Sequence, residues 1–239
     1  MVPQWQTGTV IRMEQATPNT RRYWVQIAEA ESFPFKPGQF VTLDMPIHEQ
    51  RNKRWRSYSI ASMPDDSNVI ELLIAFVDGG LASEYIFKEI QVGSTFTLRG
   101  PQGVFLTPSG AHERDMYLIC TGTGIAPVRS MLFHMHHHKT PHQNIHLIYG
   151  TRTREGLLYE DEMKGLEEKM PGFHYHPVLS RADWEGRKGY VHQVYEDLCK
   201  DKAPAAFMLC GWREMIDEAK HRILELGYDR KDVHVEIYG

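Results

Sequence analysis

The second half of the chain alternates short apolar runs with amphipathic helical segments, and this pattern constrains the fold more than any other feature. The first run, residues 116–120, is continuously apolar, as expected of a strand buried on both faces of a sheet. Repeated βα alternation predicts a Rossmann-like α/β domain with a parallel sheet and helices on both faces. We expect five strands, at 116–120, 145–149, 173–179, 206–210 and 233–237, and helices at 125–138, 159–170, 191–199 and 214–226.

Residues 1–107 follow a different rhythm. Short β-branched or aromatic runs are separated by turn formers such as Lys36-Pro37-Gly38. This spacing predicts an N-terminal antiparallel β-barrel, interrupted by one helix near residues 81–88. A Gly/Pro-rich stretch from Gly100 to Gly110 separates the two halves. We therefore expect two domains, 1–107 and 112–239.

Composition excludes several functions. Among 239 residues, 27 Lys and Arg against 31 Asp and Glu give a net charge of −4, which argues against a nucleic-acid partner. No apolar run approaches the length of a membrane span, and the N-terminus does not resemble a secretory signal. Three cysteines are too few for a Cys₄ iron–sulfur cluster and do not suggest a disulfide framework. We expect a cytoplasmic protein without a cluster of its own.

A glycine-rich turn follows the first buried strand of the second half. Thr121, Gly122 and Gly124 lie between that strand and a helical segment, where glycines let the backbone approach an anion and the helix presents free N–H groups. Pro127 stands where the strict dinucleotide fingerprint has its third glycine. These residues are candidates for nucleotide binding, and a simple strand–helix turn is the alternative.

Arginines gather after the next two strands. Arg152 follows the second strand, where an NAD-binding unit often has an acidic residue, and Arg181 and Arg187 follow the third. All three leave the carboxyl edge of the predicted sheet, where ligands bind. Because a guanidinium group suits a phosphate, the pattern favours NADP(H) over NAD(H), with solvated loop charge as the alternative.

Taken in order, several motifs resemble the ferredoxin–NADP reductase family of flavoproteins. Arg56-Ser57-Tyr58-Ser59 is similar to that family's Arg-x-Tyr-Ser flavin motif, and Gly80-Leu81-Ala82-Ser83 is similar to its turn at the flavin pyrophosphate. The resemblance covers nearly the whole chain. Segments that resemble the family's nicotinamide half are, in order, 122–127, Tyr149-Gly150, Cys210-Gly211 and Glu236-Ile237-Tyr238.

The resemblance implies an FAD site on the first domain. Arg56 would pair with the diphosphate, because its guanidinium fork fits phosphate oxygens. Tyr58 would stack on the isoalloxazine, and Ser59 would place a hydroxyl near flavin N5. Gly80 and Ser83 would lie at the pyrophosphate, where the N-terminus of a helix supplies N–H groups.

The resemblance also implies a reaction centre. Ser59, Cys210 and Glu236 would surround the atoms that exchange hydride, and Tyr238 would cover the other face of the flavin. Gly239 stands one residue beyond the usual terminal tyrosine of the family.

The family's reaction exchanges electrons between NADP(H) and a one-electron protein carrier such as ferredoxin or flavodoxin. Four basic residues within 51–56 are expected to steer a small acidic carrier, with Trp55 as an apolar contact, unless they form only a solvated loop. Two rival functions stay open: an NAD(P)H-dependent flavin reductase, and an electron-transfer subunit of a larger oxidoreductase or oxygenase.

Histidines crowd the end of one predicted helix. His134 and His138 have i, i+4 spacing, but no Glu lies between them as in metalloprotease helices. A solvated helix C-terminus is therefore the favoured interpretation, and we expect no metal site.

Overall fold

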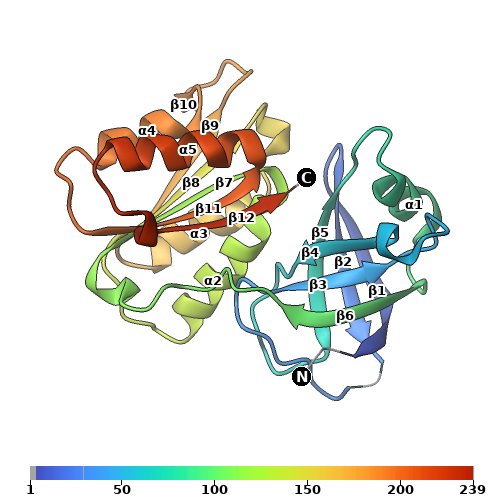
Figure 1. Ribbon diagram of the computed structural model, residues 1–239. Helices are drawn as coiled ribbons and strands as arrows, with labels where there is room; N and C mark the ends of the chain where they lie inside the picture. Colours follow the sequence, from blue (N-terminus) through green and yellow to red (C-terminus); the bar gives the residue numbers. More distant parts are fainter. Residues whose placement is uncertain (1–3, 29, 239) are drawn as a thin grey trace. The chain divides into compact units, whose positions relative to one another are not determined.

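The computed structural model describes residues 4–28 and 30–238, and the chain forms two compact units (Figure 1). The first unit runs to Leu106 and also includes Ala126–His134, whereas the second comprises Thr107–Ile125 and the residues from Met135 onward. The domain limits 1–107 and 112–239 stay predictions. Gly239 lies outside the described residues. No described helix is both long and apolar enough to cross a membrane, and the cytoplasmic location stays a prediction.

The first unit contains an antiparallel sheet with the strand order β4-β3-β6-β1-β2-β5, which confirms the predicted class. Its edge strands β4 and β5 are joined by one isolated bridge, between Ile60 and Leu72, so the sheet is barrel-like and open. The elements are β1 (Trp5–Thr17), β2 (Thr20–Ile27), β3 (Phe40–Asp44), β4 (Trp55–Ser59), β5 (Val69–Ala75), α1 (Leu81–Glu89) and β6 (Thr95–Gln102).

Strand β6 reaches into the Gly/Pro-rich stretch between the two halves. It includes Gly100 and Pro101, which lie within the predicted first domain of residues 1–107. The register of β3 against β6 shifts between Phe40 and Thr42, opposite these two residues. A local irregularity of this kind accommodates Pro, which has no N–H to donate to a neighbouring strand.

A buried carboxylate explains why part of helix α2 (Ile125–His137) belongs to the first unit. Glu71 on β5 is only 2% exposed. Arg22 Nε lies 2.6 Å from its Oε1, and Arg129 Nη1 on α2 lies 3.4 Å from its Oε2. Arg129 also donates to the Ala61 carbonyl at 2.7 Å. Paired, hydrogen-bonded groups of this kind can be buried without leaving an isolated charge.

The second unit contains a parallel sheet with helices, as predicted. Its strand order is β10-β9-β8-β7-β11-β12, so it has one strand more than the expected five. The addition is β10 (Arg187–Lys188), which pairs with the end of β9 and is too short to show a periodic pattern. The other elements are β7 (Asp115–Thr121), β8 (Ile145–Thr151), α3 (Glu160–Lys169), β9 (Phe173–Leu179), α4 (Val191–Leu198), β11 (Ala205–Trp212), α5 (Arg213–Glu225) and β12 (Val233–Tyr238).

Helices cover both faces of this parallel sheet (Figure 1). Tyr117 and Ile119 of β7 belong to a buried cluster with α4 and α5. Leu118 and Cys120 alternate with them and therefore point to the opposite face, where they are also fully buried. Burial on both faces explains why the sequence of β7 is continuously apolar.

The order of strands creates a switch point in the second unit. The chain leaves β7 to build β8, β9 and β10 on one side, and then returns to build β11 and β12 on the other. The carboxyl ends of β7 and β11 therefore flank the position where open α/β sheets bind their ligands.

Candidate flavin and nucleotide sites

The predicted flavin residues of β4 divide between its two faces. Arg56 pairs in register with Leu43, and Tyr58 with Val41, so the two side chains lie on the same face of β4. Arg56 is exposed and Tyr58 is half-buried, whereas Ser59 is only 5% exposed. Burial raises the pKa of Tyr58, and the nearby Arg56 charge partly opposes this effect. The Tyr58 hydroxyl is therefore neutral at physiological pH.

The backbone of β4 holds the Arg56 side chain. Its Nη1 donates to the carbonyl oxygens of Lys53 at 3.0 Å and Trp55 at 2.8 Å. These bonds fix part of the guanidinium group on an exposed strand. The planar fork of Arg suits two phosphate oxygens at once, so its chemistry fits the diphosphate of FAD.

The turn before α1 is closed by one buried hydroxyl. Ser83 Oγ accepts from the Val77 N–H at 3.0 Å, and its own hydrogen lies within reach of the Val77 and Gly80 carbonyls, at 2.9 and 3.0 Å. A Cβ at Gly80 would lie 2.9 Å from both Ser83 Oγ and the Val77 carbonyl. Gly80 caps α1 without a side-chain hydrogen bond. The first-turn N–H groups of α1 therefore fit the FAD diphosphate.

Glycines in the second unit allow two loops to meet at the switch point. Gly122 has φ +53° and Gly211 has φ +145°. A Cβ at Gly124 would collide with the Cys210 carbonyl, and one at Gly211 would collide with Thr121 Oγ1. Close backbone approach is therefore possible only with glycine at these positions. The structure thus brings together Thr121, Gly122, Gly124 and Cys210.

A buried tyrosine fixes the orientation of the Gly122 loop. The Tyr149 hydroxyl, at the end of β8, lies 3.1 Å from the Gly122 carbonyl and 3.4 Å from the Gly156 carbonyl. The Ile125 N–H also bonds the Gly122 carbonyl. Thr121 Oγ1 is buried and has no hydrogen-bond partner among the described residues. The Gly122 carbonyl oxygen is occupied by these bonds, and the Thr121 hydroxyl can donate to a ligand. Both features fit the diphosphate of a pyridine nucleotide.

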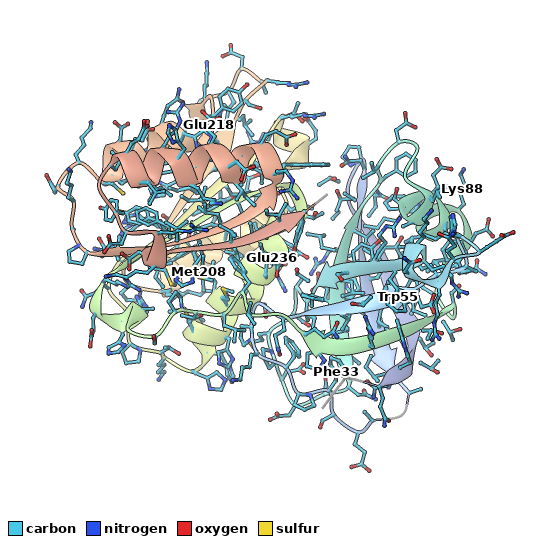
Figure 2. All side chains as sticks on the ribbon, in the orientation of Figure 1. Phe33, Trp55, Lys88, Met208, Glu218 and Glu236 are labelled. Carbon is cyan, nitrogen blue, oxygen red and sulfur yellow. The ribbon has the colours of Figure 1, made fainter. Side chains whose placement is uncertain are left out.

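Three predicted residues meet between β11 and β12. Cys210 pairs in register with Glu236, and its Sγ lies 4.0 Å from Glu236 Oε1; Figure 2 labels Glu236 on β12. Cys210 is fully buried, whereas Glu236 and Tyr238 are half-buried. Burial, and then the Glu236 carboxylate, raise the pKa of the Cys210 thiol well above its usual range. The thiol stays protonated at neutral pH.

The predicted phosphate-binding arginines lie on loops that are hydrogen-bonded to each other. The Arg181 N–H donates to the Arg152 carbonyl at 2.9 Å, and the Ser180 N–H donates to the Thr151 carbonyl at 3.0 Å. Arg152, Arg181 and Arg187 are all exposed. The carboxyl edge of the sheet therefore carries two adjacent basic loops, followed by Arg187 on β10.

Sequence reasoning missed two groups in the second unit. Tyr190 directly follows the Arg187-Lys188-Gly189 run and is 67% exposed, so an aromatic face lies beside this basic strand. The only indication in the sequence was an aromatic residue, Tyr190, at the end of a basic run. The hydrogen bonds of Tyr149 had no signal, because they join residues 27 and 7 positions away in the chain.

Histidines also meet across the sheet. His146 Nδ1 on β8 lies 3.1 Å from His176 Nε2 on β9, and the His146 ring stacks on both His174 and His176. Burial lowers the pKa of His146, and it lowers that of His176 to about 4. In residues 4–28 and 30–238, no group of three or more His, Cys, Asp or Glu could hold a metal ion.

Comparisons with known proteins agree with this architecture. An Oxidoreductase FAD-binding domain model matches residues 7–106, and an Oxidoreductase NAD-binding domain model matches residues 118–221. The chain is 33% identical to ferredoxin–NADP reductase B of Sorangium cellulosum, over 96% of each protein. It is 32% identical to the anthranilate 1,2-dioxygenase electron transfer component of Acinetobacter baylyi, over 78% of this chain and 53% of that protein.

A solved structure carries the same fold. The crystal structure of a ferredoxin NADP⁺ reductase from Neisseria gonorrhoeae with bound FAD and NADP matches 98% of both chains, with a TM-score of 0.81 and 25% identity. The antiparallel first unit and the parallel second unit thus form a fold that this chain shares with that structure. The chain belongs to the ferredoxin–NADP reductase family and is a flavin-dependent oxidoreductase that uses FAD and a pyridine nucleotide.

Proposed function

We propose that this protein exchanges electrons between NADP(H) and a one-electron protein carrier such as ferredoxin or flavodoxin. Bound FAD supplies the chemistry that links hydride transfer to single-electron transfer, and the protein supplies binding and orientation. Support comes from the match to a ferredoxin–NADP reductase along 96% of the chain, and from the basic loops at the carboxyl edge of the parallel sheet.

In this proposal the first unit binds FAD through its strand β4 and its turn before α1. Arg56 and the first-turn N–H groups after Gly80 neutralise the diphosphate, while Ser83 shapes the turn from within. Tyr58 offers a flat, neutral aromatic face for the isoalloxazine. Ser59 offers a hydroxyl for flavin N5.

The second unit holds the nicotinamide end of the nucleotide. The Cys210 thiol is protonated, so it acts as a small hydrogen-bond donor and not as a nucleophile. Glu236, 4.0 Å from Cys210 Sγ, orients this thiol and accepts its hydrogen. Tyr238 lies two residues further along β12 and provides the aromatic cover that the family resemblance implies.

The observation that carries the NADP(H) assignment is the bonded pair of loops after β8 and β9. The Arg181 N–H to Arg152 carbonyl bond keeps two exposed guanidinium groups on neighbouring loops, and Arg187 follows on β10. A doubly charged 2′-phosphate gains from such a cluster, whereas the 2′-hydroxyl of NAD(H) gains little.

Arg181→Ala and Arg187→Ala test this assignment. We expect each change to raise KM for NADPH by about tenfold, the loss of one charge-assisted hydrogen bond, while KM for NADH stays within about twofold. Arg154→Ala serves as the matched control, because Arg154 lies on the same edge but pairs with Glu185 at 3.4 Å. Equal effects on NADPH and NADH would contradict the 2′-phosphate assignment.

We propose that the electron carrier is small and acidic and meets the basic segment before β4. Asp44 on β3 already compensates part of this charge, since it lies 2.8 Å from Arg54 Nε and 3.9 Å from Arg51 Nε. Lys53 is exposed and has no ion pair within the described part of the chain. Trp55, labelled in Figure 2, is half-buried, and its ring centroid lies 5.5 Å from that of Trp5.

These contacts make Lys53 the sharpest test of docking. Lys53→Glu should slow ferredoxin reduction at low salt and flatten its salt dependence, because steering by charge weakens as ions screen it. Reduction of ferricyanide by the same variant should not change. An unaltered salt dependence would remove the segment from the docking surface.

Relatedness to an oxygenase component supports a second candidate function. The Acinetobacter relative is named an electron transfer component of a dioxygenase, and this chain spans 53% of it. In that role the acceptor would be an oxygenase system instead of a free carrier. Comparing turnover with ferredoxin, flavodoxin and an oxygenase component separates the two candidates, and release of reduced flavin into solution would instead identify a flavin reductase.

A further inference from the structure

Trp212 is a large side chain at the carboxyl edge of the parallel sheet to which the proposed function gives no role. It follows Gly211 at the end of β11, at the switch point of the second unit, and it is 54% exposed. A single exposed aromatic side chain is ordinary by itself, so the position of Trp212 beside the glycine loop decides what it can bind.

The indole nitrogen of Trp212 lies directly beside the glycine loop. A Cβ built on Gly122 would have one neighbour within 4 Å, Trp212 Nε1 at 3.9 Å. Trp212 Nε1 donates no hydrogen bond to any described residue. The Gly122 carbonyl is not its partner, because the Tyr149 hydroxyl and the Ile125 N–H occupy that oxygen.

The groups around this position are mainly donors. Indole nitrogen can only donate a hydrogen bond, and the N–H groups at the start of a helix also lack intrahelical acceptors. Thr121 Oγ1 is buried nearby without a hydrogen-bond partner in the described chain. A cluster of donors with a positive helix end beside it matches an anion, and the anion common to both pyridine nucleotides is their diphosphate.

We propose that the Trp212 indole N–H binds a diphosphate oxygen of the pyridine nucleotide, beside the Gly122–Gly124 loop. This inference deepens the proposed function and rests on its placement of the nucleotide at the switch point. Trp212 is then a binding residue that does not distinguish NADP from NAD, because both carry the same diphosphate. The arginines of the neighbouring loops supply the discrimination.

Calorimetric binding to the FAD-loaded protein tests this role without relying on turnover. Trp212→Phe keeps an aromatic ring but removes the N–H, and Trp212→Ala removes both. We expect both variants to weaken NADP⁺ and NAD⁺ by about tenfold, as for the loss of one hydrogen bond to a charged group. Adenosine 2′-monophosphate, which has no diphosphate, should bind each variant as it binds the parent protein.

The alternative outcomes are distinct. If Trp212→Phe binds NADP⁺ like the parent while Trp212→Ala does not, the ring stacks on the nucleotide and the hydrogen-bond assignment is overturned. If neither variant alters NADP⁺ binding but Arg181→Ala still does, the inference fails and the proposed function stands. Leu224→Ala, at an exposed apolar position on helix α5, which begins directly after Trp212, controls for nonspecific effects. Failure of the parent protein to bind either dinucleotide would overturn the proposed function itself.

Discussion

Two glycine turns for which we propose the same task, the binding of a diphosphate, are stabilised in different ways. The turn before α1 is tied by Ser83, a residue of the helix that it opens. The loop before α2 is tied by Tyr149, which comes from the neighbouring strand β8. The first turn is therefore a local structure, whereas the second depends on the assembled sheet.

This difference has a physical consequence. A local hydrogen bond forms with little loss of chain entropy, because the residues that it joins are already close in the chain. A bond between strands forms only when the sheet has its register. The flavin turn should consequently respond to changes within a few residues, and the nucleotide loop should respond to changes far away in the sequence.

The largest expected effect comes from adding one methyl group to the nucleotide loop. Gly124→Ala places a Cβ against the Cys210 carbonyl, a backbone group that cannot rotate away. We expect a loss of about 3 kcal/mol in the free energy of unfolding, at the upper end for overpacking. Chemical denaturation followed by fluorescence measures it.

Gly80→Ala is the matched change in the flavin turn. Its Cβ would lie 2.9 Å from Ser83 Oγ, a side-chain atom that can shift, and equally close to the Val77 carbonyl. The loss should be smaller than for Gly124→Ala. An equal loss in both variants would show that the two turns are equally constrained.

Ser83→Ala should have the next largest effect. It removes the acceptor of the Val77 N–H in a site that is almost fully buried. Leaving a buried donor unsatisfied costs about 2 kcal/mol. The FAD content of the purified protein should fall, while KM for NADPH measured on the FAD-saturated protein should not change. A normal FAD content would separate Ser83 from the flavin turn.

The histidine stack of the second unit should make stability depend on pH. The pKa of His176 is about 4 in the folded protein and about 6.5 in an unfolded chain, so the unfolded chain binds more protons between these values. Stability therefore falls as pH drops through this window, by up to ~1.4 kcal/mol per pH unit for one histidine.

Denaturation curves at several pH values check this prediction. His176→Gln should flatten the loss of stability between pH 6.5 and pH 4, while His112→Gln, at an exposed position, should leave it as in the parent protein. If both variants lost stability with the parent slope, His176 would not be the group that titrates.

Tyr149→Phe should give the smallest of these effects. It leaves the ring buried and removes only the hydroxyl that holds Gly122 and Gly156. We expect a loss of ~1 kcal/mol in stability, typical of one hydrogen bond, and a several-fold rise in KM for both nucleotides. Because the hydroxyl shapes the loop and does not touch reacting atoms, kcat should change little. A fall in kcat at unchanged KM would contradict a positioning role.

The difference between local and long-range interactions explains how far the sequence predicted the structure. The elements of the second half were located closely, because a strand buried on both faces, such as β7, has a continuous apolar run. The sequence did not indicate strand β6, which contains Gly100 and Pro101. Glycine and proline are turn formers by local preference, and pairing with β1 and β3 overrides that preference.

Among the candidate site residues, too, local patterns were predictable from the sequence and contacts between strands were not. A short motif placed Gly122 in a turn, and the structure has it there, whereas Arg56 lies within β4 and Cys210 lies two residues before the end of β11. The bonds of Tyr149 and the stacking of His146 on His174 have no local signature, because they depend on the register between strands. Their partners are set by the folded sheet and not by spacing along the chain.

Burial of the cysteines has a consequence for the resistance of the protein to oxidation and alkylation. Cys120, Cys199 and Cys210 are all free and buried, and burial raises the pKa of each thiol. Peroxides and alkylating agents attack the thiolate, so reaction at these sites requires the local structure to open first. The protein thus keeps its thiols in the form that peroxide attacks most slowly.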